Sequence, residues 1–238
     1  MLRLRLLTWD AKDTLLRLRL PVGQSYAAAA RALGLRVEPE ALGLAFRDAY
    51  GAQSRRFPNY GRGRGLSSQQ WWAAVVKETF RLAGVREEGA LALLAERLYR
   101  DFCGAGSWEV LPGAAAALSR CRQRGFRMGV VSNFDSRLED VLRRCGLRHH
   151  FDFVLTSEAA GFAKPDRRIF EKALSLGGAP PELAAHVGDD YRRDYGGARG
   201  AGMHGFLLRP AGHGPEPRVP PEHVLPTLGH LLPLIQKG

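Results

Sequence analysis

The apolar and polar residues of this 238-residue chain change their spacing along its length. Residues 1–9 alternate basic and apolar side chains with period two and lead into Asp10, which predicts a first β-strand. Apolar residues then recur at spacings of three and four, which predicts four helices. These helices are expected at residues 25–34, 39–50, 67–84 and 89–102. Ser67 and Gly84 suit the start and the end of the third helix.

From residue 110 onward, short apolar segments alternate with amphipathic ones. Strands are expected at residues 126–131, 151–156, 184–188 and 204–208, and helices at residues 113–124, 136–145, 166–176, 193–201 and, after a Pro/Gly-rich loop at 210–221, 224–236. This alternation predicts an α/β fold with a parallel sheet and helices on both faces. The simplest architecture joins the first strand to this second half. It gives an α/β core domain of residues 1–16 and 109–238 and an all-helical cap domain of residues 17–108.

Composition narrows the class of protein. An apolar fraction of 45% is enough for a real core, and no stretch reaches the roughly 18 consecutive apolar residues of a membrane span. The three cysteines, Cys103, Cys121 and Cys145, predict neither a metal site nor a disulfide framework, because they are scattered and odd in number. We interpret the arginine-rich start as a strand rather than a targeting presequence. We therefore expect a soluble intracellular protein, cytoplasmic or nuclear.

A formal net charge of +11 indicates either attraction to anions or simply a solvated, arginine-rich surface. The densest cluster, residues 55–65, mixes arginine with aromatic residues and glycine, as some RNA-binding loops do. In the predicted cap, candidate substrate-binding residues are Arg55, Arg56, Tyr60 and Trp71, with surface charge or helix packing as the alternative. We expect a monomer whose partner is a small phosphorylated anion. Nucleic acid is the alternative partner, and no membrane is expected.

Four polar clusters each follow a predicted strand: residues 10–14, Ser132 with Asn133, Lys164, and residues 188–194. In an open α/β sheet the carboxyl ends of the strands meet, so these clusters should converge. The carboxylates of Asp10, Asp189 and Asp194 are hard oxygen ligands that suit Mg²⁺. Lys164 and Ser132 suit the oxygens of a phosphate, and Asp10 suits attack on phosphorus. The set therefore predicts a site for phosphoryl transfer.

Together these clusters resemble the haloacid dehalogenase superfamily, in its D-x-D-x-T form with a helical cap inserted after the first motif. The segments G-F-A-K-P-D-R-R-I-F (161–170) and H-V-G-D-D-Y-R-R-D-Y-G-G-A-R-G-A-G-M (186–203) are similar to the third and fourth motifs of that family. The resemblance covers the whole chain. It implies a Rossmann-like core that carries the catalytic residues and a cap that supplies specificity.

The resemblance also implies roles for individual residues. Asp10 would be the nucleophile that forms an aspartyl-phosphate, Ser132 would donate a hydrogen bond to the transferring phosphoryl group, and Lys164 would neutralise its charge. The implied Mg²⁺ ligands are Asp10, the backbone carbonyl of Lys12, Asp189 and Asp194. Three further candidates are Thr14, which fixes the register of the first motif and is grouped with the catalytic residues, Asn133, grouped with the substrate-binding residues, and Asp190.

The sequence departs from the family at Lys12 and Asp13. The second aspartate of the family motif protonates the leaving group and helps to activate water, whereas this chain has Lys12 there and Asp13 in place of the usual glycine. General acid–base catalysis is typically worth about 10²–10⁴ in rate. Three arrangements are open: Lys12 turns outward while its carbonyl still binds metal, Asp13 takes over as the acid, or Lys12 pairs with Asp10 and occupies the site.

Three functions follow from these arrangements. A Mg²⁺-dependent phosphatase of low activity would prefer good leaving groups such as acyl or aryl phosphates. A catalytically impaired protein would use the pocket, or the arginines of residues 55–64, to bind an anionic partner. A dehalogenase would use the same aspartate nucleophile without metal, and the acidic residues 189–194 argue against it because they suit a cation.

Overall fold

A computed structural model describes residues 1–210, 212, 214, 216 and 218–238 of the chain. The chain divides into two compact units. The first unit consists of Met1–Arg17, Val110–Phe134 and Leu142–Gly238, and the second of Leu18–Glu109 and Asp135–Val141. The division expected from the sequence gives residues 135–141 to the core domain. In the structure this segment lies in the second, helical unit.

The first unit contains a six-stranded parallel sheet. In spatial order its strands are β6 (Phe153–Thr156), β5 (Arg127–Ser132), β2 (Leu6–Trp9), β7 (Ala184–Gly188), β8 (His204–Leu208) and β9 (Val224–Leu225). The strand predicted from the N-terminal pattern therefore lies at the centre of the sheet. Its neighbours β5 and β7 lie on opposite sides of it, so the chain reverses its winding direction here. This is the position at which parallel α/β sheets bind ligands, at the carboxyl ends of the strands.

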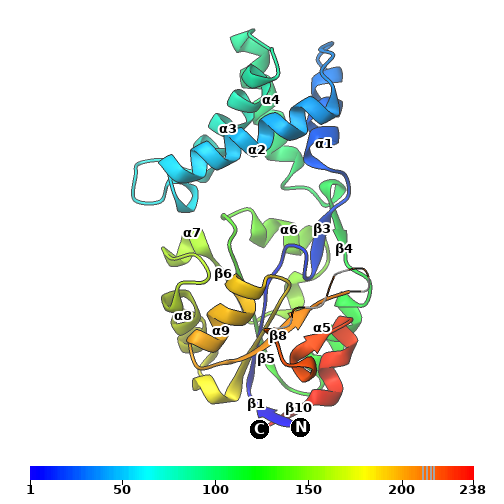
Figure 1. Ribbon diagram of the computed structural model, residues 1–238, viewed down its shortest axis with the longest axis vertical. Helices are drawn as coiled ribbons and strands as arrows, with labels where there is room; N and C mark the ends of the chain where they lie inside the picture. Colours follow the sequence, from blue (N-terminus) through cyan, green and yellow to red (C-terminus); the bar gives the residue numbers. More distant parts are fainter. Residues whose placement is uncertain (211, 213, 215, 217) are drawn as a thin grey trace. The chain divides into compact units, whose positions relative to one another are not determined.

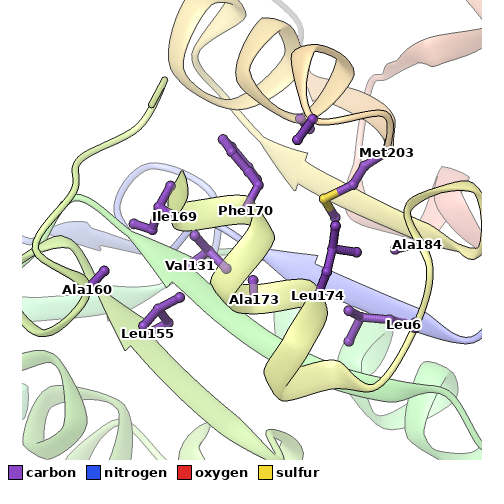
Figure 2. Close-up of a cluster of buried hydrophobic side chains, with 13 residues drawn as sticks. Leu6, Val131, Leu155, Ala160, Ile169, Phe170, Ala173, Leu174, Ala184 and Met203 are labelled. Carbon is purple, nitrogen blue, oxygen red and sulfur yellow. The ribbon is translucent and has the colours of Figure 1, made fainter. Parts of the chain in front are cut away.

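Helices cover both faces of this sheet (Figure 1). The helices of the first unit are α5 (Ala114–Gln123), the C-terminal end of α6 (Leu138–Arg144), α7 (Ser157–Ala160), α8 (Arg167–Gly177) and α9 (Gly197–Gly200). Figure 2 shows the cluster in which Phe170 and Leu174 of α8 lie over Leu6, Val131 and Leu155 of three adjacent strands. The clustered residues are buried, and fully burying a large aliphatic or aromatic side chain contributes about 1.5–3 kcal/mol. This packing holds β2, β5 and α8 in fixed positions around the sheet edge.

The C-terminal segment differs from the sequence prediction. Residues 224–236 are not one helix: β9 is followed by a 3₁₀ segment, Leu228–Leu234, and by strand β10 (Ile235–Lys237). Pro233 explains the correction, because it has no backbone N–H to donate to a continuing α-helix. β10 pairs in parallel with β1 (Leu2–Leu4), so the two ends of the chain lie side by side (Figure 1). Four residues of the expected loop at 210–221 lie outside the described residues.

Shorter helical segments complete the first unit. They are the 3₁₀ segments Arg148–His150, Pro181–Leu183 and Pro221–His223 and a π-helical turn, Tyr191–Gly196. The helix predicted at 193–201 is thus a π-helical turn continued by α9. The turn places Asp194 directly over Gly188 at the end of β7. The regular helix predicted from residue 193 onward does not indicate this position for Asp194.

The second unit contains the four helices that apolar spacing predicts. They are α1 (Val22–Arg31), α2 (Pro39–Arg56), α3 (Ser68–Leu82) and α4 (Glu88–Asp101), with 3₁₀ segments at Asn59–Gly61 and Ala105–Ser107. Ser67 is the N-cap of α3 and forms a capping box with Gln70, as its position in the sequence predicts. Strands β3 (Leu16–Leu18) and β4 (Trp108–Val110) pair with each other, and each contains one of the four points at which the chain passes from one unit to the other. No helix among the described residues is both long and apolar enough to cross a membrane.

A buried polar cluster lies within the second unit. The carboxylate of Asp135 accepts three hydrogen bonds from Arg137, at 2.8 Å from Nε, 2.7 Å from a terminal guanidinium nitrogen and 3.0 Å from the backbone N–H. It also accepts one from Nε1 of Trp72 at 2.6 Å. The Arg137 guanidinium lies 4.8 Å from the Trp72 ring centre and 4.6 Å from that of Tyr99. Segment 135–141 is therefore attached to helices α3 and α4 by charged hydrogen bonds and cation–π contacts.

The variant Trp72→Phe should lose about 1.5–3 kcal/mol of unfolding free energy, because it removes a hydrogen-bond donor from a buried carboxylate. Urea unfolding followed by circular dichroism measures the loss. In an Asp135→Asn background the same substitution should cost less, since the charged acceptor is already absent. Equal losses in the two backgrounds would show that Trp72 stabilises the unit by packing alone.

Candidate functional site

A polar cavity of about 110 Å³ lies at the carboxyl ends of β2, β5 and β7. Its lining residues all belong to the first unit and come from the four predicted clusters: Asp10, Lys12, Asp13, Ser132, Asn133, Lys164, Asp189, Asp190, Arg193 and Asp194. Ligand pockets for drug-sized molecules span about 300–1,000 Å³. This cavity is the right size for one small polar group, such as a phosphoryl group, rather than for a whole metabolite.

Lys164 is the central cation of the cavity. Its Nζ donates to Oδ1 of Asp10 at 2.7 Å and to Oδ1 of Asp194 at 2.5 Å, and all three side chains are buried. Burial alone would lower the pKa of Lys164, but the two carboxylates raise it above its ordinary value. The amine is therefore a permanent positive charge, which is what a group that neutralises phosphate oxygens requires.

Hydrogen bonds to the backbone hold Asp10 and Lys164 in place. The backbone N–H of Asp10, directly after β2, donates to the carbonyl of Val187 in β7 at 2.9 Å. The side chain of Asn133 forms two hydrogen bonds with the backbone of Lys164. Its Nδ2 donates to the Lys164 carbonyl at 2.9 Å, and its Oδ1 accepts from the Lys164 N–H at 2.7 Å. Asn133, expected as a substrate-binding residue, lines the cavity and also holds the backbone of Lys164 in place.

Gly188 allows Asp194 to approach the end of β7. A Cβ atom on Gly188 would lie 2.2 Å from Cγ of Asp194, which is too close for two carbon atoms that are not bonded to each other. Only glycine therefore fits at this position. The Asp194 carboxylate also accepts a hydrogen bond from the backbone N–H of Asp190 to Oδ2 at 3.0 Å. A glycine at the end of β7 and the π-helical turn after it together bring this carboxylate into the cavity.

Three carboxylates converge as a hard cation requires. Asp10, Asp189 and Asp194 each offer an oxygen, and these oxygens lie within 4.8 Å of one another. Thr14, which is fully buried, donates from Oγ1 to Oδ1 of Asp189 at 3.1 Å. Burial and the neighbouring carboxylates raise the pKa of Asp189 to about 7. The oxygen donors, their spacing and their mutual repulsion fit a site for Mg²⁺.

The pKa values of the other two carboxyls shift in opposite directions. Burial raises the pKa of Asp10, and the charge of Lys164 and hydrogen bonds from Lys164 and Ser132 offset this only in part. Burial also opposes ionisation of Asp194, but the charge of Lys164 and a hydrogen bond with His186 hold its pKa well below the ordinary range. Asp194 is thus the firmly ionised member of the group.

Lys12 and Asp13 form an ion pair with each other. Both side chains are about half exposed (50% and 48%), and both residues line the cavity. Asp10 accepts instead from Lys164. Of the three arrangements that the sequence leaves open, the structure has Lys12 turned toward solvent, with Asp13 as its partner. Asp13 has a φ of 64°, in the left-handed region that glycine adopts most readily.

His186 and Thr8 are buried neighbours of the site that sequence reasoning missed. They are paired residues of β7 and β2. Nδ1 of His186 lies 2.9 Å from Oγ1 of Thr8, and its Nε2 lies 3.2 Å from Oδ1 of Asp194. A histidine inside an apolar strand, two residues before a Gly-Asp pair, was the available signal. Its value depended on the register between two strands far apart in the sequence.

Arg193 lies in the predicted cluster 188–194, but sequence reasoning gave it no role. It lines the cavity, and its Nε donates to Oδ2 of Asp190 at 3.0 Å, so the pair lies at the cavity wall.

The expected cap residues lie in the second unit. Arg55 and Arg56 are exposed at the end of α2. Tyr60 packs against the rings of Trp71 and Trp72, with centroid distances of 5.3 and 6.2 Å.

Comparison with known sequences gives a consistent set of relatives. A family model described as haloacid dehalogenase-like hydrolase matches residues 4–202. The chain is 59% identical to haloacid dehalogenase-like hydrolase domain-containing protein 3 of Bos taurus, over 98% of this chain and 94% of that protein. The Homo sapiens protein of that name is 58% identical over the same shares. The rhythmically expressed gene 2 protein of Drosophila melanogaster is 30% identical, over 87% of this chain and 83% of that protein.

Solved structures share the fold. A 2-haloacid dehalogenase from Pseudomonas syringae pv. Tomato DC3000 has a TM-score of 0.72 at 23% identity and covers 98% of both chains. A HAD phosphatase from Thermococcus onnurineus has a TM-score of 0.68 at 22% identity, with 98% of this chain and 97% of that chain covered. The likeness concerns the fold alone at these identities, and it confirms the α/β architecture predicted from the sequence.

Proposed function

Because the chain belongs to the haloacid dehalogenase-like hydrolase family, we propose that it is a Mg²⁺-dependent phosphatase acting on small phosphorylated metabolites. The observation that carries the proposal is the convergence of Asp10, Asp189 and Asp194 around a cavity that also contains Lys164. A metal-free displacement by Asp10 would not need two further carboxylates beside it. A phosphoryl group needs both the cation and the lysine to neutralise its oxygens.

The proposed reaction starts at Asp10. A carboxylate oxygen of Asp10 attacks phosphorus, the bond from phosphorus to the leaving oxygen breaks, and its electron pair departs with that oxygen. An aspartyl-phosphate results, and water then attacks its phosphorus to release inorganic phosphate and regenerate the carboxylate. Lys164 holds the phosphoryl oxygens, and Ser132, buried beside Asp10, donates a hydrogen bond to them.

Three carboxylates and one carbonyl would hold the cation. Asp10, Asp189 and Asp194 supply hard oxygens, and the carbonyl of Lys12 would add the fourth protein ligand. When bound, Mg²⁺ neutralises negative charge that develops on the phosphoryl oxygens. Thr14 fixes the orientation of Asp189 through the hydrogen bond described above.

The residue at position 12 determines which substrates this site would use. Position 12, where a second aspartate would protonate the leaving oxygen, is occupied by Lys12, whose ammonium pairs with Asp13 at the cavity wall and supplies no carboxylic acid. A leaving group that is stable as an anion does not need that proton. The proposed substrates are therefore acyl or aryl phosphates in preference to alkyl phosphates.

Purified protein with Mg²⁺ should hydrolyse acyl and aryl phosphates slowly in a broad phosphate panel, and Asp10→Asn should abolish this hydrolysis. The variant keeps the shape of the side chain but removes the nucleophilic oxygen. Asp48→Asn, an exposed aspartate of α2, is the matched control and should retain full activity. Chelation of the metal should have the same effect as Asp10→Asn. Turnover by Asp10→Asn equal to wild type, or hydrolysis of nothing in the panel by wild type, would contradict the proposal.

An anion-binding protein without turnover is the second candidate, and the Lys12–Asp13 pair favours it. Such a protein would bind an anionic partner through the exposed arginines of residues 55–64. Its interaction should weaken as salt is added and should survive Asp10→Asn. If RNA or another anion is still retained after neutralisation of Arg55, Arg56, Arg62 and Arg64, this segment is not the binding surface.

A further inference from the structure

A chain of buried polar groups continues the proposed site into the sheet. Oγ1 of Thr8 lies 2.9 Å from Nδ1 of His186, whose Nε2 lies 3.2 Å from Oδ1 of Asp194. Both Thr8 and His186 have zero exposure to solvent. Their side chains therefore exchange hydrogen bonds with protein groups rather than with bulk water. The proposed chemistry uses Asp194 but assigns nothing to the two residues behind it.

The atom opposite Nε2 of His186 shows that this nitrogen carries hydrogen. Oδ1 of Asp194 is an acceptor that already receives a hydrogen bond from Lys164, and Asp194 Oδ2 receives one from the backbone N–H of Asp190. A bare Nε2 would place two lone pairs against each other at 3.2 Å in a buried site. Nε2 of His186 must therefore carry hydrogen and donate to Asp194. Burial lowers the pKa of His186, which agrees with a neutral ring.

The hydroxyl of Thr8 completes the assignment. In a neutral ring with hydrogen on Nε2, Nδ1 is an acceptor, so the Thr8 hydroxyl donates to it. The alternative acceptor for this hydroxyl, the carbonyl of Ala185, is more distant at 3.3 Å. Thr8 and His186 are directly paired across β2 and β7, so the backbone register of the central strands sets the geometry of the contact.

We propose that His186 is a positioning residue of the site, which donates from Nε2 to Asp194 and is itself held by Thr8. The inference rests on the proposed function, because positioning has a purpose only if Asp194 takes part in cation and phosphate binding. Three donors then hold the Asp194 carboxylate: the Lys164 amine, the Asp190 N–H and the His186 ring. Without the His186 donor, the carboxylate can rotate away from Lys164 and from the cation.

A purely structural role for His186 gives a different expectation. Its ring also packs edge-on against Phe170, with centroids 5.3 Å apart, so any large ring would fill the space. If filling space were its only task, His186→Phe would leave cation binding intact. If donation from Nε2 is the task, His186→Gln should rescue what His186→Phe loses, because a glutamine amide can present N–H groups close to the position of Nε2.

The first test is spectroscopic and needs no activity. Two-bond ¹H–¹⁵N correlation spectra of the ¹⁵N-labelled protein report which ring nitrogen of each of the seven histidines carries hydrogen. His186→Gln identifies the His186 signals by their disappearance. Hydrogen on Nε2 is the expected result. A ring with hydrogen on Nδ1 alone would overturn the proposal.

The second test measures the affinity of the intact chain for Mg²⁺ alone by titration calorimetry. Loss of an outer hydrogen-bond partner of a metal ligand typically costs 10–100-fold in affinity, so His186→Phe should lose about that much. His186→Gln should stay closer to wild type, Thr8→Val should weaken binding, and Thr8→Ser should preserve it. Thermal melts show whether each variant is folded. Equal affinities of His186→Phe, His186→Gln and wild type would overturn the proposal.

The two tests separate this inference from the proposed function. If the wild-type chain binds no Mg²⁺, the proposed phosphatase fails, while the spectrum still decides whether Nε2 donates to Asp194. If Mg²⁺ binds with equal affinity in wild type and in all variants, the positioning role of His186 is wrong, whereas the proposed phosphatase function is not contradicted.

Discussion

Replacement of Lys12 by aspartate should raise the turnover of alkyl phosphates by about 10²–10⁴-fold, the usual contribution of a general acid. The backbone at position 12 would then place a carboxyl group at the cavity wall, where the leaving oxygen must be protonated. Acyl and aryl phosphates should gain much less, because their leaving groups depart as stable anions. Steady-state rates for a series of phosphate esters of increasing leaving-group pKa measure the effect.

Two controls isolate the acid. Lys12→Asn removes the lysine charge without supplying a proton donor and should leave the dependence on leaving group as steep as in wild type. Lys12→Asp also deprives Asp13 of its partner, so Asp13→Gly should be added in a double variant; glycine adopts the φ of 64° there without strain. Equal gains for alkyl and aryl phosphates would mean that Lys12 acts through charge alone.

Removal of the Lys164 amine by Lys164→Met should abolish hydrolysis and lower the unfolding free energy by about 3–5 kcal/mol. The amine bonds to two buried carboxylates, and breaking a buried ion pair from one side leaves uncompensated charge. Urea unfolding and the phosphate assay measure the two effects. Lys172→Met is the matched control. Lys172 lies exposed on α8, its amine donates to the carbonyl of Ala160 at 2.9 Å and lies 5.8 Å from the centre of the Phe162 ring, and its replacement should change neither quantity much.

The origin of this stability loss can be tested with a second substitution. In an Asp10→Asn background only Asp194 keeps a full charge opposite Lys164, so Lys164→Met should destabilise less than it does in the wild-type background. An equal loss in both backgrounds would mean that packing of the lysine stem, rather than its charge, stabilises the core.

Much of the fold and the placement of the candidate site could be predicted because parallel strands place their ends at one edge. Asp10 directly follows β2, and Lys164, far away in the sequence, lies in the loop after β6 and the short helix α7; Nζ of Lys164 nevertheless lies 2.7 Å from Oδ1 of Asp10. The four helices of the second unit follow from apolar spacing, and the start of α3 follows from the cap at Ser67. These features depend on local patterns that one sequence carries.

Other features depend on contacts that a local pattern does not encode. The strand at 184–188 can be predicted, but the contact between His186 and Thr8 follows only from the register between β7 and β2. Asp135 follows the strand β5 of the core, yet its side chain is buried in the second unit by Trp72 and Arg137. Motif comparison likewise does not predict the ion pair between Lys12 and Asp13, because the motif has no lysine at that position.

The central place of β2 in the sheet has a consequence for synthesis of the chain. A ribosome makes β2 before its neighbours in the sheet: the partners of Leu6 are Arg127 in β5 and Ala184 in β7, which emerge more than a hundred residues later. Until then both edges of an apolar strand lack their native neighbours, which is the condition that favours wrong pairing and chaperone binding. Asp10 thus leaves the ribosome before most residues of its cavity, which closes around it only after β7 and the turn that follows it have been translated.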